Sequence, residues 1–251
     1  MEDPQQVARY AAVADQLKAQ IGKLASNSLL PSEDQLARRF KVSRVTIRRA
    51  LAVLEGSGLV DRQRGRGTIV NPPKVLRSLI PMVPIEDDLM QQGLKMTTEV
   101  LSVERRACVP DHVLDKLQRT RSDAISAITL LRSVDDRVIS FDRRYISDSI
   151  VDDLDLSEIG TTPTWILFGR CARLPITEYK TEMEFVPSSQ DEARILRVTP
   201  GTLLVVNTGT DHLQDGEPYC VTAMYYRIDR VRFSFVFGDS QMNNMPVKTN
   251  P

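Results

Sequence analysis

Residues 29–70 read LLPSEDQLARRFKVSRVTIRRALAVLEGSGLVDRQRGRGTIV, and this segment decides the fold of the first part of the chain. Ser32 lies three positions before Gln35, which is the spacing of a capping box at the beginning of a helix. A short turn at residues 41–42 follows, and Ser43 can cap a second helix. Two capped helices joined by so short a turn predict a helix-turn-helix.

The second helix is expected over residues 44–57, with one apolar face and one cationic face. Its apolar residues recur at spacings of four and three, the pattern of a helix face that packs on a core. They are Ile47, Leu51 and Leu54. Gly58 suits the left-handed conformation that ends many helices. The face that points away from this core carries arginines and therefore predicts a surface that can meet DNA.

A basic hairpin is expected after the second helix. Residues 59–62 and 68–70 are predicted to form its strands around the glycine-bearing segment 63–67. Arginines on a helix can pair with guanine edges in the major groove, whereas a thin wing with Arg64 and Arg66 suits the narrower minor groove. A single arginine on a helix is often just solvated, but the caps, turn, spacing and wing agree over one segment.

The same residues resemble a known family. LPSEDQLARRFKVSRVTIRRAL followed by GLVDRQRGRGTIV is similar to the winged-helix domain of GntR-type bacterial transcription regulators, over residues 8–72. The resemblance implies that the serine of LPSE, the Ser-Arg-x-Thr-x-Arg run and the wing glycines contact an operator. With the neighbouring arginines, the expected DNA-binding residues are Ser32, Arg38, Ser43, Arg44, Thr46, Arg48, Arg49, Arg64, Gly65, Arg66 and Gly67.

Charge is divided unevenly along the chain. Residues 1–74 contain 13 Lys and Arg against 7 Asp and Glu, which leaves 20 of the 33 basic and 26 of the 33 acidic residues for the remainder. A basic first part attracts phosphate through counterion release, whereas an acidic remainder is a poor nucleic-acid surface. The chain is neutral only on average, and its two parts are expected to serve different purposes.

The composition is ordinary for a globular protein with two cores, with 251 residues, 41% of them hydrophobic. An apolar run of eighteen residues is missing and the first residues are acidic and polar, so we expect neither a membrane span nor a signal peptide and place the protein in the cytoplasm. Cys108, Cys171 and Cys220 are widely spaced, which favours reduced, mostly packed thiols. His112 and His212 are isolated, so no metal site, serine triad or cofactor is expected.

Two consecutive prolines, Pro72 and Pro73, end the wing because proline has no amide hydrogen to give to a strand ladder. Several apolar residues follow them and indicate a linker that docks rather than a free coil. The predicted organisation is a winged helix-turn-helix domain at 1–72, a linker at 73–84, a second domain at 85–240 and a flexible tail at 241–251.

The second domain has a mixed pattern of alternating and helical segments. Strands are expected at 97–106, 124–133, 138–146, 176–186, 203–212, 218–227 and 231–237. Helices are expected at 89–92, 111–117, 164–170 and 188–196. Hairpin turns are predicted at 134–137 and around Asp215-Gly216. The fold class is therefore α+β, an antiparallel sheet with interspersed helices.

This second part resembles the effector-binding UTRA domain of the HutC-like branch of GntR regulators, over residues 85–238. The resemblance rests on Leu131-Arg132 before Asp135-Asp136, on the segment 191–196, and on Asp215-Gly216-Glu217-Pro218 before Tyr225-Tyr226-Arg227. It implies a fold like that of chorismate lyase. It also implies effector-binding positions, which fall here on Arg132, Asp142, Thr164, Thr222, Tyr225 and Arg227.

Arg132 can hold a carboxylate or phosphate with two parallel hydrogen bonds, and a helix beginning near Thr164 would add amide donors for the same group. Taken alone, each of these residues is more often part of a structural pair. Leu130, Cys220 and Ala223 replace residues that are commonly charged in the family. We therefore expect Leu130 and Ala223 to face an apolar part of a small organic acid or phosphorylated metabolite, with a small acid favoured over a sugar phosphate.

The predicted function is a dimeric, sequence-specific transcription regulator, a repressor, whose binding to double-stranded operator DNA changes when a small molecule binds the second domain. The alternative is an enzyme with a lyase-like domain tethered to DNA, against which the sequence offers no paired acid and base at a recognisable spacing. A third interpretation is an architectural DNA-binding protein that has no ligand.

Overall fold

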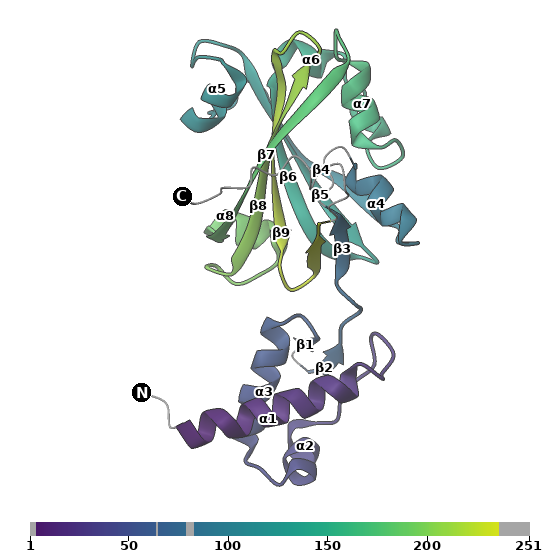
Figure 1. The fold of residues 1–251 in the computed structure, drawn as a ribbon, viewed down its shortest axis with the longest axis vertical. Helices are drawn as coiled ribbons and strands as arrows, with labels where there is room; N and C mark the ends of the chain where they lie inside the picture. Colours follow the sequence, from purple (N-terminus) through teal and green to yellow (C-terminus); the bar gives the residue numbers. More distant parts are fainter. Residues whose placement is uncertain (1–3, 64, 79–82, 236–251) are drawn as a thin grey trace, which may run out of the picture. The chain divides into compact units, whose positions relative to one another are not determined.

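The computed structural model describes residues 4–63, 65–78 and 83–235 (Figure 1). The chain divides into two compact units. The first unit comprises Met1–Val75 with Ile228–Val231, and the second comprises Leu76–Arg227 with Arg232–Pro251.

The described residues of the first unit form three helices and a two-stranded hairpin. They are α1 (Pro4–Ile21), α2 (Glu33–Phe40), α3 (Arg44–Gly56), β1 (Val60–Gln63) and β2 (Gly67–Val70). The predicted capping box is confirmed, because Gln35 N donates to Ser32 Oγ at 3.3 Å and Ser32 N donates to Gln35 Oε1 at 2.9 Å. Ser43 Oγ caps α3 in the same way, accepting from Thr46 N at 3.2 Å.

One apolar core holds this unit together. Ile47, Leu51 and Leu54 of α3 are buried against Leu36 of α2 and Leu17 of α1, as the helical spacing predicts. Gly58 follows α3 with φ +76°, the left-handed conformation expected of it. β1 and β2 pair antiparallel, and the predicted winged helix-turn-helix is confirmed.

The second unit is built on a six-stranded antiparallel sheet in the order β4-β5-β6-β9-β8-β7. Its strands are β4 (Met96–Glu104), β5 (Ile125–Val134), β6 (Arg137–Ser147), β7 (Ile176–Pro187), β8 (Leu203–Leu213) and β9 (Pro218–Arg227). Its helices are α4 (Ile85–Gln91), α5 (Asp111–Leu117), α6 (Asp148–Asp152), α7 (Thr164–Arg170), α8 (Gln190–Leu196) and the 3₁₀ turn Leu156–Glu158. The predicted α+β class is confirmed.

Two further strands, β3 (Val75–Ser78) and β10 (Val231–Ser234), pair with each other. Strand β3 lies within the predicted linker, residues 73–84, so part of that segment is regular structure. The end of the predicted strand 231–237 and the predicted tail 241–251 lie outside the described residues.

Helices cover both faces of the large sheet (Figure 1). On one face α5 and α8 pack against Tyr145 and Phe141 of β6. On the other face α6 and α7 pack against Ile146 of the same strand. Because successive residues of a strand point to opposite faces, Asp142 and Arg144 lie on the α7 side. The alternation of strand residues therefore determines which side chains lie between the sheet and α7.

Candidate DNA-binding surface and effector cavity

The outer face of α3 carries exposed basic residues that α2 holds in place. Arg44 Nε lies 3.0 Å from Asp34 Oδ1, and the two side chains are 60% and 58% exposed. Arg48 Nη2 lies 3.3 Å from Glu33 Oε2, and Glu33 also pairs with Arg62 of β1 at 2.6 Å. An ion pair as exposed as Arg44–Asp34 contributes little to stability, so Arg44 can exchange its carboxylate for DNA at low cost. Glu33 is only 21% exposed, so Arg48 is the exposed partner of a half-buried carboxylate.

The other predicted DNA-binding residues of the helices sit around these pairs. Ser32 and Ser43 are exposed at the two caps, and Thr46 Oγ1 lies 2.9 Å from Ser43 Oγ. Arg38 is exposed and donates weakly to the Asp34 carbonyl at 3.4 Å, while Arg49 is half-buried. Both predicted serines therefore lie exposed near these pairs, with hydroxyl oxygens that accept the capping hydrogen bonds of α2 and α3.

The wing has the conformation that its glycines permit. Gly65 and Gly67 have φ of +80° and +99°, values that residues with side chains rarely adopt. Arg66 is exposed on the same turn, and its Nη1 lies 3.5 Å from Gln63 Oε1. Arg64, also predicted to contact DNA, lies outside the described residues.

Sequence analysis did not single out one exposed apolar residue at the beginning of α3. Val45 is 58% exposed between Arg44 and Thr46. Its position could have been found, because it falls outside the spacing of the buried residues of α3. A branched apolar side chain at this place can contact a thymine methyl group in the major groove.

The second unit contains a cavity of about 730 Å³ on the α7 side of the sheet. This volume lies within the range of small-molecule sites. Most of its wall is apolar or aromatic, from Trp165, Phe168, Tyr179, Met183, Met224 and Phe235. Its charged and polar lining residues include Arg77, Glu86, Arg144, Thr164, Asn207, Asp211 and Thr222. Such a site combines an apolar wall with a few polar groups that fix orientation.

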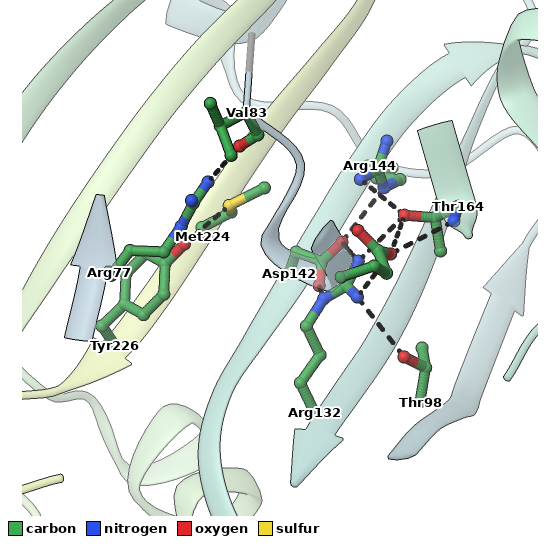
Figure 2. A network of polar contacts seen from close by, with 10 residues as sticks. Arg77, Val83, Thr98, Arg132, Asp142, Arg144, Thr164, Met224 and Tyr226 are labelled. Atoms are coloured by element: carbon green, nitrogen blue, oxygen red, sulfur yellow. Dashed lines mark hydrogen bonds and ion pairs between the residues drawn. The ribbon is translucent and has the colours of Figure 1, made fainter. Parts of the chain in front are cut away.

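Several residues of the cavity lining belong to a buried charge cluster. Figure 2 shows its hydrogen bonds and ion pairs. Arg132 is 1% exposed and holds Asp142 with two hydrogen bonds, Nε to Oδ1 at 2.7 Å and Nη2 to Oδ2 at 3.3 Å. Arg144 Nε donates to the same Asp142 Oδ2 at 3.0 Å, and its guanidinium lies 4.7 Å from the ring centre of Phe168. Asp142 thus neutralises charge from two arginines at once.

Glu86 of α4 completes the cluster. Its Oε1 accepts from Arg132 Nη1 at 2.9 Å, from Thr164 Oγ1 at 2.7 Å and from Thr164 N at 3.1 Å. Arg132 also donates to Thr98 Oγ1 at 3.3 Å. Burial acts to raise the pKa of Glu86, but the charge of Arg132 and the Thr164 hydrogen bonds outweigh it and lower that pKa to about 2.

The structure brings together four of the six predicted effector positions. Arg132, Asp142 and Thr164 share the charge cluster, and Thr222 lines the cavity, with Cys220 Sγ 3.6 Å from its hydroxyl. Asp142 and Arg132 are sealed from the cavity by burial. Only the Thr164 and Thr222 positions are therefore directly open to a molecule in it.

The two remaining predicted positions lie elsewhere. Tyr225 stacks on Phe141 with ring centres 4.4 Å apart, on the face of the sheet opposite to Thr222. Arg227 donates to the Leu196 carbonyl at 3.1 Å, beneath α8. Strand alternation explains this placement, because β9 turns its even-numbered residues 222 and 224 toward the cavity.

Leu130 and Ala223, expected to face an apolar part of the ligand, do not line the cavity. Leu130 is fully buried in the core beneath α6 and α7. Ala223 lies between Thr222 and Met224, both of which line the cavity, and so points to the other face. The apolar wall comes instead from α7 and β7, with Met224 of β9 and Phe235.

Several cavity residues were not predicted from the sequence. Arg144 could have been, because it lies two residues after Asp142 on the same face of β6. Asp211 of β8 also lines the cavity; burial raises its pKa, and the charge of Arg144 opposes that rise. Glu86 lies 46 residues from Arg132 in sequence, and no local pattern connects the two.

Comparisons with known proteins agree with these two units. Residues 9–70 match the family described as bacterial regulatory proteins, gntR family, and residues 91–232 match the UTRA domain. The chain is 28% identical over 232 residues to the HTH-type transcriptional repressor NagR of Bacillus subtilis, covering 89% of this chain and 92% of NagR. It is 25% identical over 194 residues to the histidine utilization repressor of Pseudomonas putida, covering 76% and 77%.

Solved structures share the fold. The crystal structure of PhnF from Mycobacterium smegmatis matches with a TM-score of 0.60 at 19% identity, over 90% of this chain and 99% of PhnF. Within the part of the chain that the structure describes, no helix is both long enough and apolar enough to cross a membrane. The chain belongs to the GntR family of bacterial regulatory proteins, as a DNA-binding transcription regulator whose second unit is a UTRA domain.

Proposed function

We propose that the protein is a cytoplasmic repressor that binds an inverted-repeat operator as a homodimer. Its affinity for this DNA changes when a small organic acid or phosphorylated metabolite occupies the cavity. The observation that carries the proposal is the exposed cationic face of α3, where the side chains of Arg44 and Arg48 are each 60% exposed. Two relatives of this chain, NagR and the histidine utilization repressor, are repressors.

A homodimer is supported by the size of the recognition surface. One chain offers one recognition helix, and a single helix reads too few base pairs to find an operator in a genome. Two copies related by a twofold axis would read two half-sites. The wing, with Arg66 and its glycines, would add contacts in the flanking minor groove.

The cavity supports a binding role better than a catalytic one. Asp142 is 1% exposed and bonded to two arginines, so it is not placed to take a proton from a substrate. The volume of about 730 Å³ and the aromatic wall suit a small metabolite with an apolar part. We therefore propose that the second unit binds its ligand without transforming it.

The proposal is tested by DNA binding of Arg44→Ala and Arg48→Ala. An operator is first selected from random DNA with the wild-type chain, and dissociation constants are then measured by fluorescence anisotropy on that operator and on random DNA. Each variant should lose about 1–3 kcal/mol on the operator and less on random DNA. Arg194→Ala is the matched control, because Arg194 is also an exposed arginine paired with a carboxylate, Asp191, at 2.9 Å.

Equal losses on the two DNAs would show that the arginines contact only phosphate. A loss in the control as large as in the α3 variants would contradict the proposed surface. Footprinting at saturation should reveal two half-sites related by a dyad, and a single asymmetric half-site bound by one chain would contradict the homodimer.

A further inference from the structure

Glu86 occupies a set of donors suited to an acid group. One oxygen, Oε1, receives a charged hydrogen bond from Arg132, a hydroxyl hydrogen bond and a backbone amide hydrogen bond from Thr164, at 2.7–3.1 Å. Charge-assisted hydrogen bonds of this kind are the strong ones that proteins use for carboxylate and phosphate groups. Here the acid comes from the chain's own helix α4.

The four side chains that direct ion pairs join into the cluster are balanced in charge. Arg132 and Arg144 carry two positive charges, and Asp142 and Glu86 carry two negative ones. Without Glu86 the cluster would keep one uncompensated positive charge, which is costly in a buried place. An anion from outside could therefore replace Glu86, and replacement would keep the cluster neutral.

Of the two carboxylates, Glu86 is the one that can be exchanged. Asp142 is 1% exposed and bonded on both sides. The side chain of Glu86 is 16% exposed and lines the cavity. A molecule in the cavity therefore meets Glu86 before it can reach Arg132.

Helix α4 also holds strand β3. Asp88 Oδ2 accepts from Arg77 Nη1 at 2.8 Å and from Ser78 N at 2.6 Å. Gln92, directly after α4, bonds both the amide and the carbonyl of Leu76, at 3.1 and 2.6 Å. The short helix α4 thus connects the cavity to strand β3. A shift of Glu86 would be transmitted to β3 through Asp88 and Gln92, which follow it by two and six positions.

We propose that Glu86 is an internal competitor for the effector: it holds the place of the effector's acid group, the effector must displace it to bind Arg132 and Thr164, and the displacement moves α4 against β3. This inference rests on the proposed function, since it names the chemical group that the cavity recognises and how binding is passed on. A competitor on the same chain acts at an effective concentration of about millimolar or more, and it weakens every external acid accordingly.

The test uses inorganic phosphate as the probe and Trp165 as the reporter. Trp165 is the only tryptophan of the chain, lines the cavity, and follows Thr164 directly. Phosphate is titrated into the full-length wild type and into Glu86→Ala and Glu86→Gln while tryptophan fluorescence is recorded. Glu178→Gln is the matched control, because Glu178 is also a paired carboxylate of the second unit, 3.0 Å from Lys180, but it does not line the cavity.

Glu86→Ala should bind phosphate at least about tenfold more tightly than the wild type, because the internal competitor is gone. Glu86→Gln keeps the size of the side chain, and its phosphate affinity should lie between those of Glu86→Ala and the wild type. It replaces the alanine variant in the test if that variant does not fold. Glu178→Gln should match the wild type. Equal affinities in all the folded chains, or no phosphate binding by either Glu86 variant, overturns the inference.

Hydrogen exchange tests the connection to β3. Phosphate should increase amide exchange at residues 76–78 and 88–92 in the wild type, whereas Glu86→Ala should show that faster exchange before phosphate is added. The same exchange in every state contradicts the connection. These measurements do not involve DNA, so they separate this inference from the proposed function. If the Glu86 variants bind phosphate more tightly but the protein binds no operator, only the proposed function is wrong. If the protein binds its operator but the Glu86 variants have the phosphate affinity of the wild type, only this inference is wrong.

Discussion

The two units use arginine–carboxylate pairs in opposite ways. Arg44 lies 3.0 Å from Asp34 and is 60% exposed, whereas Arg132 lies 2.7 Å from Asp142 and is 1% exposed. The distances are nearly the same, so the difference lies in the solvent. An exposed pair contributes about 0–1 kcal/mol and gives way to a new partner, whereas breaking a buried pair leaves a charge without solvent or counterion. The first arrangement suits contact with DNA and the second suits a fixed scaffold beside a ligand.

The largest effect is expected from Asp142→Ala. This change leaves Arg132 and Arg144 buried without their shared carboxylate, which should lower the free energy of unfolding by about 3–5 kcal/mol. Asp34→Ala removes the partner of Arg44 in the exposed pair and should change it by no more than about 0.5 kcal/mol. Urea unfolding followed by circular dichroism measures both. Similar losses of unfolding free energy in the two variants would contradict the claim that burial distinguishes the two pairs.

The same contrast explains what the sequence could predict. In the first unit the contacts that build the surface are local, since Ser32 caps Gln35 and Ser43 caps Thr46 three positions on. Helix periodicity then separates buried from exposed residues without knowledge of the rest of the fold. The winged helix-turn-helix, its caps and its exposed arginines were therefore within reach of sequence analysis.

The second unit depends on contacts between distant segments. Arg132 meets Asp142 across a hairpin and could be paired from the predicted strands, but Thr164 and Glu86 lie 32 and 46 residues away from it. No periodicity encodes such distances. Strand alternation explains why Tyr225 does not line the cavity, because it lies one residue away from Met224, which does. Alternation alone does not say which of the two faces carries the cavity.

The next effect concerns the helix that orients the exposed arginines. Ser32→Ala removes the capping box of α2, whose first turn carries Glu33 and Asp34, the partners of Arg48 and Arg44. The free energy of unfolding of the first unit should fall by about 1 kcal/mol. Thermal unfolding measures it, with Ser189→Ala as the control, because Ser189 forms the same capping box on α8 in the second unit. A loss confined to the second unit in both variants would contradict the assignment.

A smaller effect follows from releasing Arg44 without removing it. Asp34→Asn discharges its partner and should tighten operator binding by less than about 1 kcal/mol, because an exposed pair is weak and is screened by salt. Dissociation constants at two salt concentrations measure the change, which should shrink at the higher one. Asp191→Asn in the second unit, beside Arg194, is the control and should leave DNA binding as it is. Weaker operator binding in Asp34→Asn would mean that Asp34 positions Arg44 for DNA.

The smallest effect is expected at Asp211, a cavity carboxylate whose pKa is raised by burial and only partly brought back by Arg144. A raised pKa means that folding favours the protonated form, so the stability that Asp211 contributes is present below its ordinary pKa of 3.8 and is lost as the pH rises through the raised value. Asp211→Asn cannot ionise, so it should match the wild type at about pH 3 and unfold at a higher temperature at about pH 7. Asp215→Asn should do the opposite, because its pKa is lowered, chiefly by the Glu217 amide, and the charged form helps the folded state at pH 7. A lower unfolding temperature of Asp211→Asn at pH 7 would contradict this expectation. It would mean that a favourable partner stabilises the charged carboxylate of Asp211, as the two arginines do for Asp142.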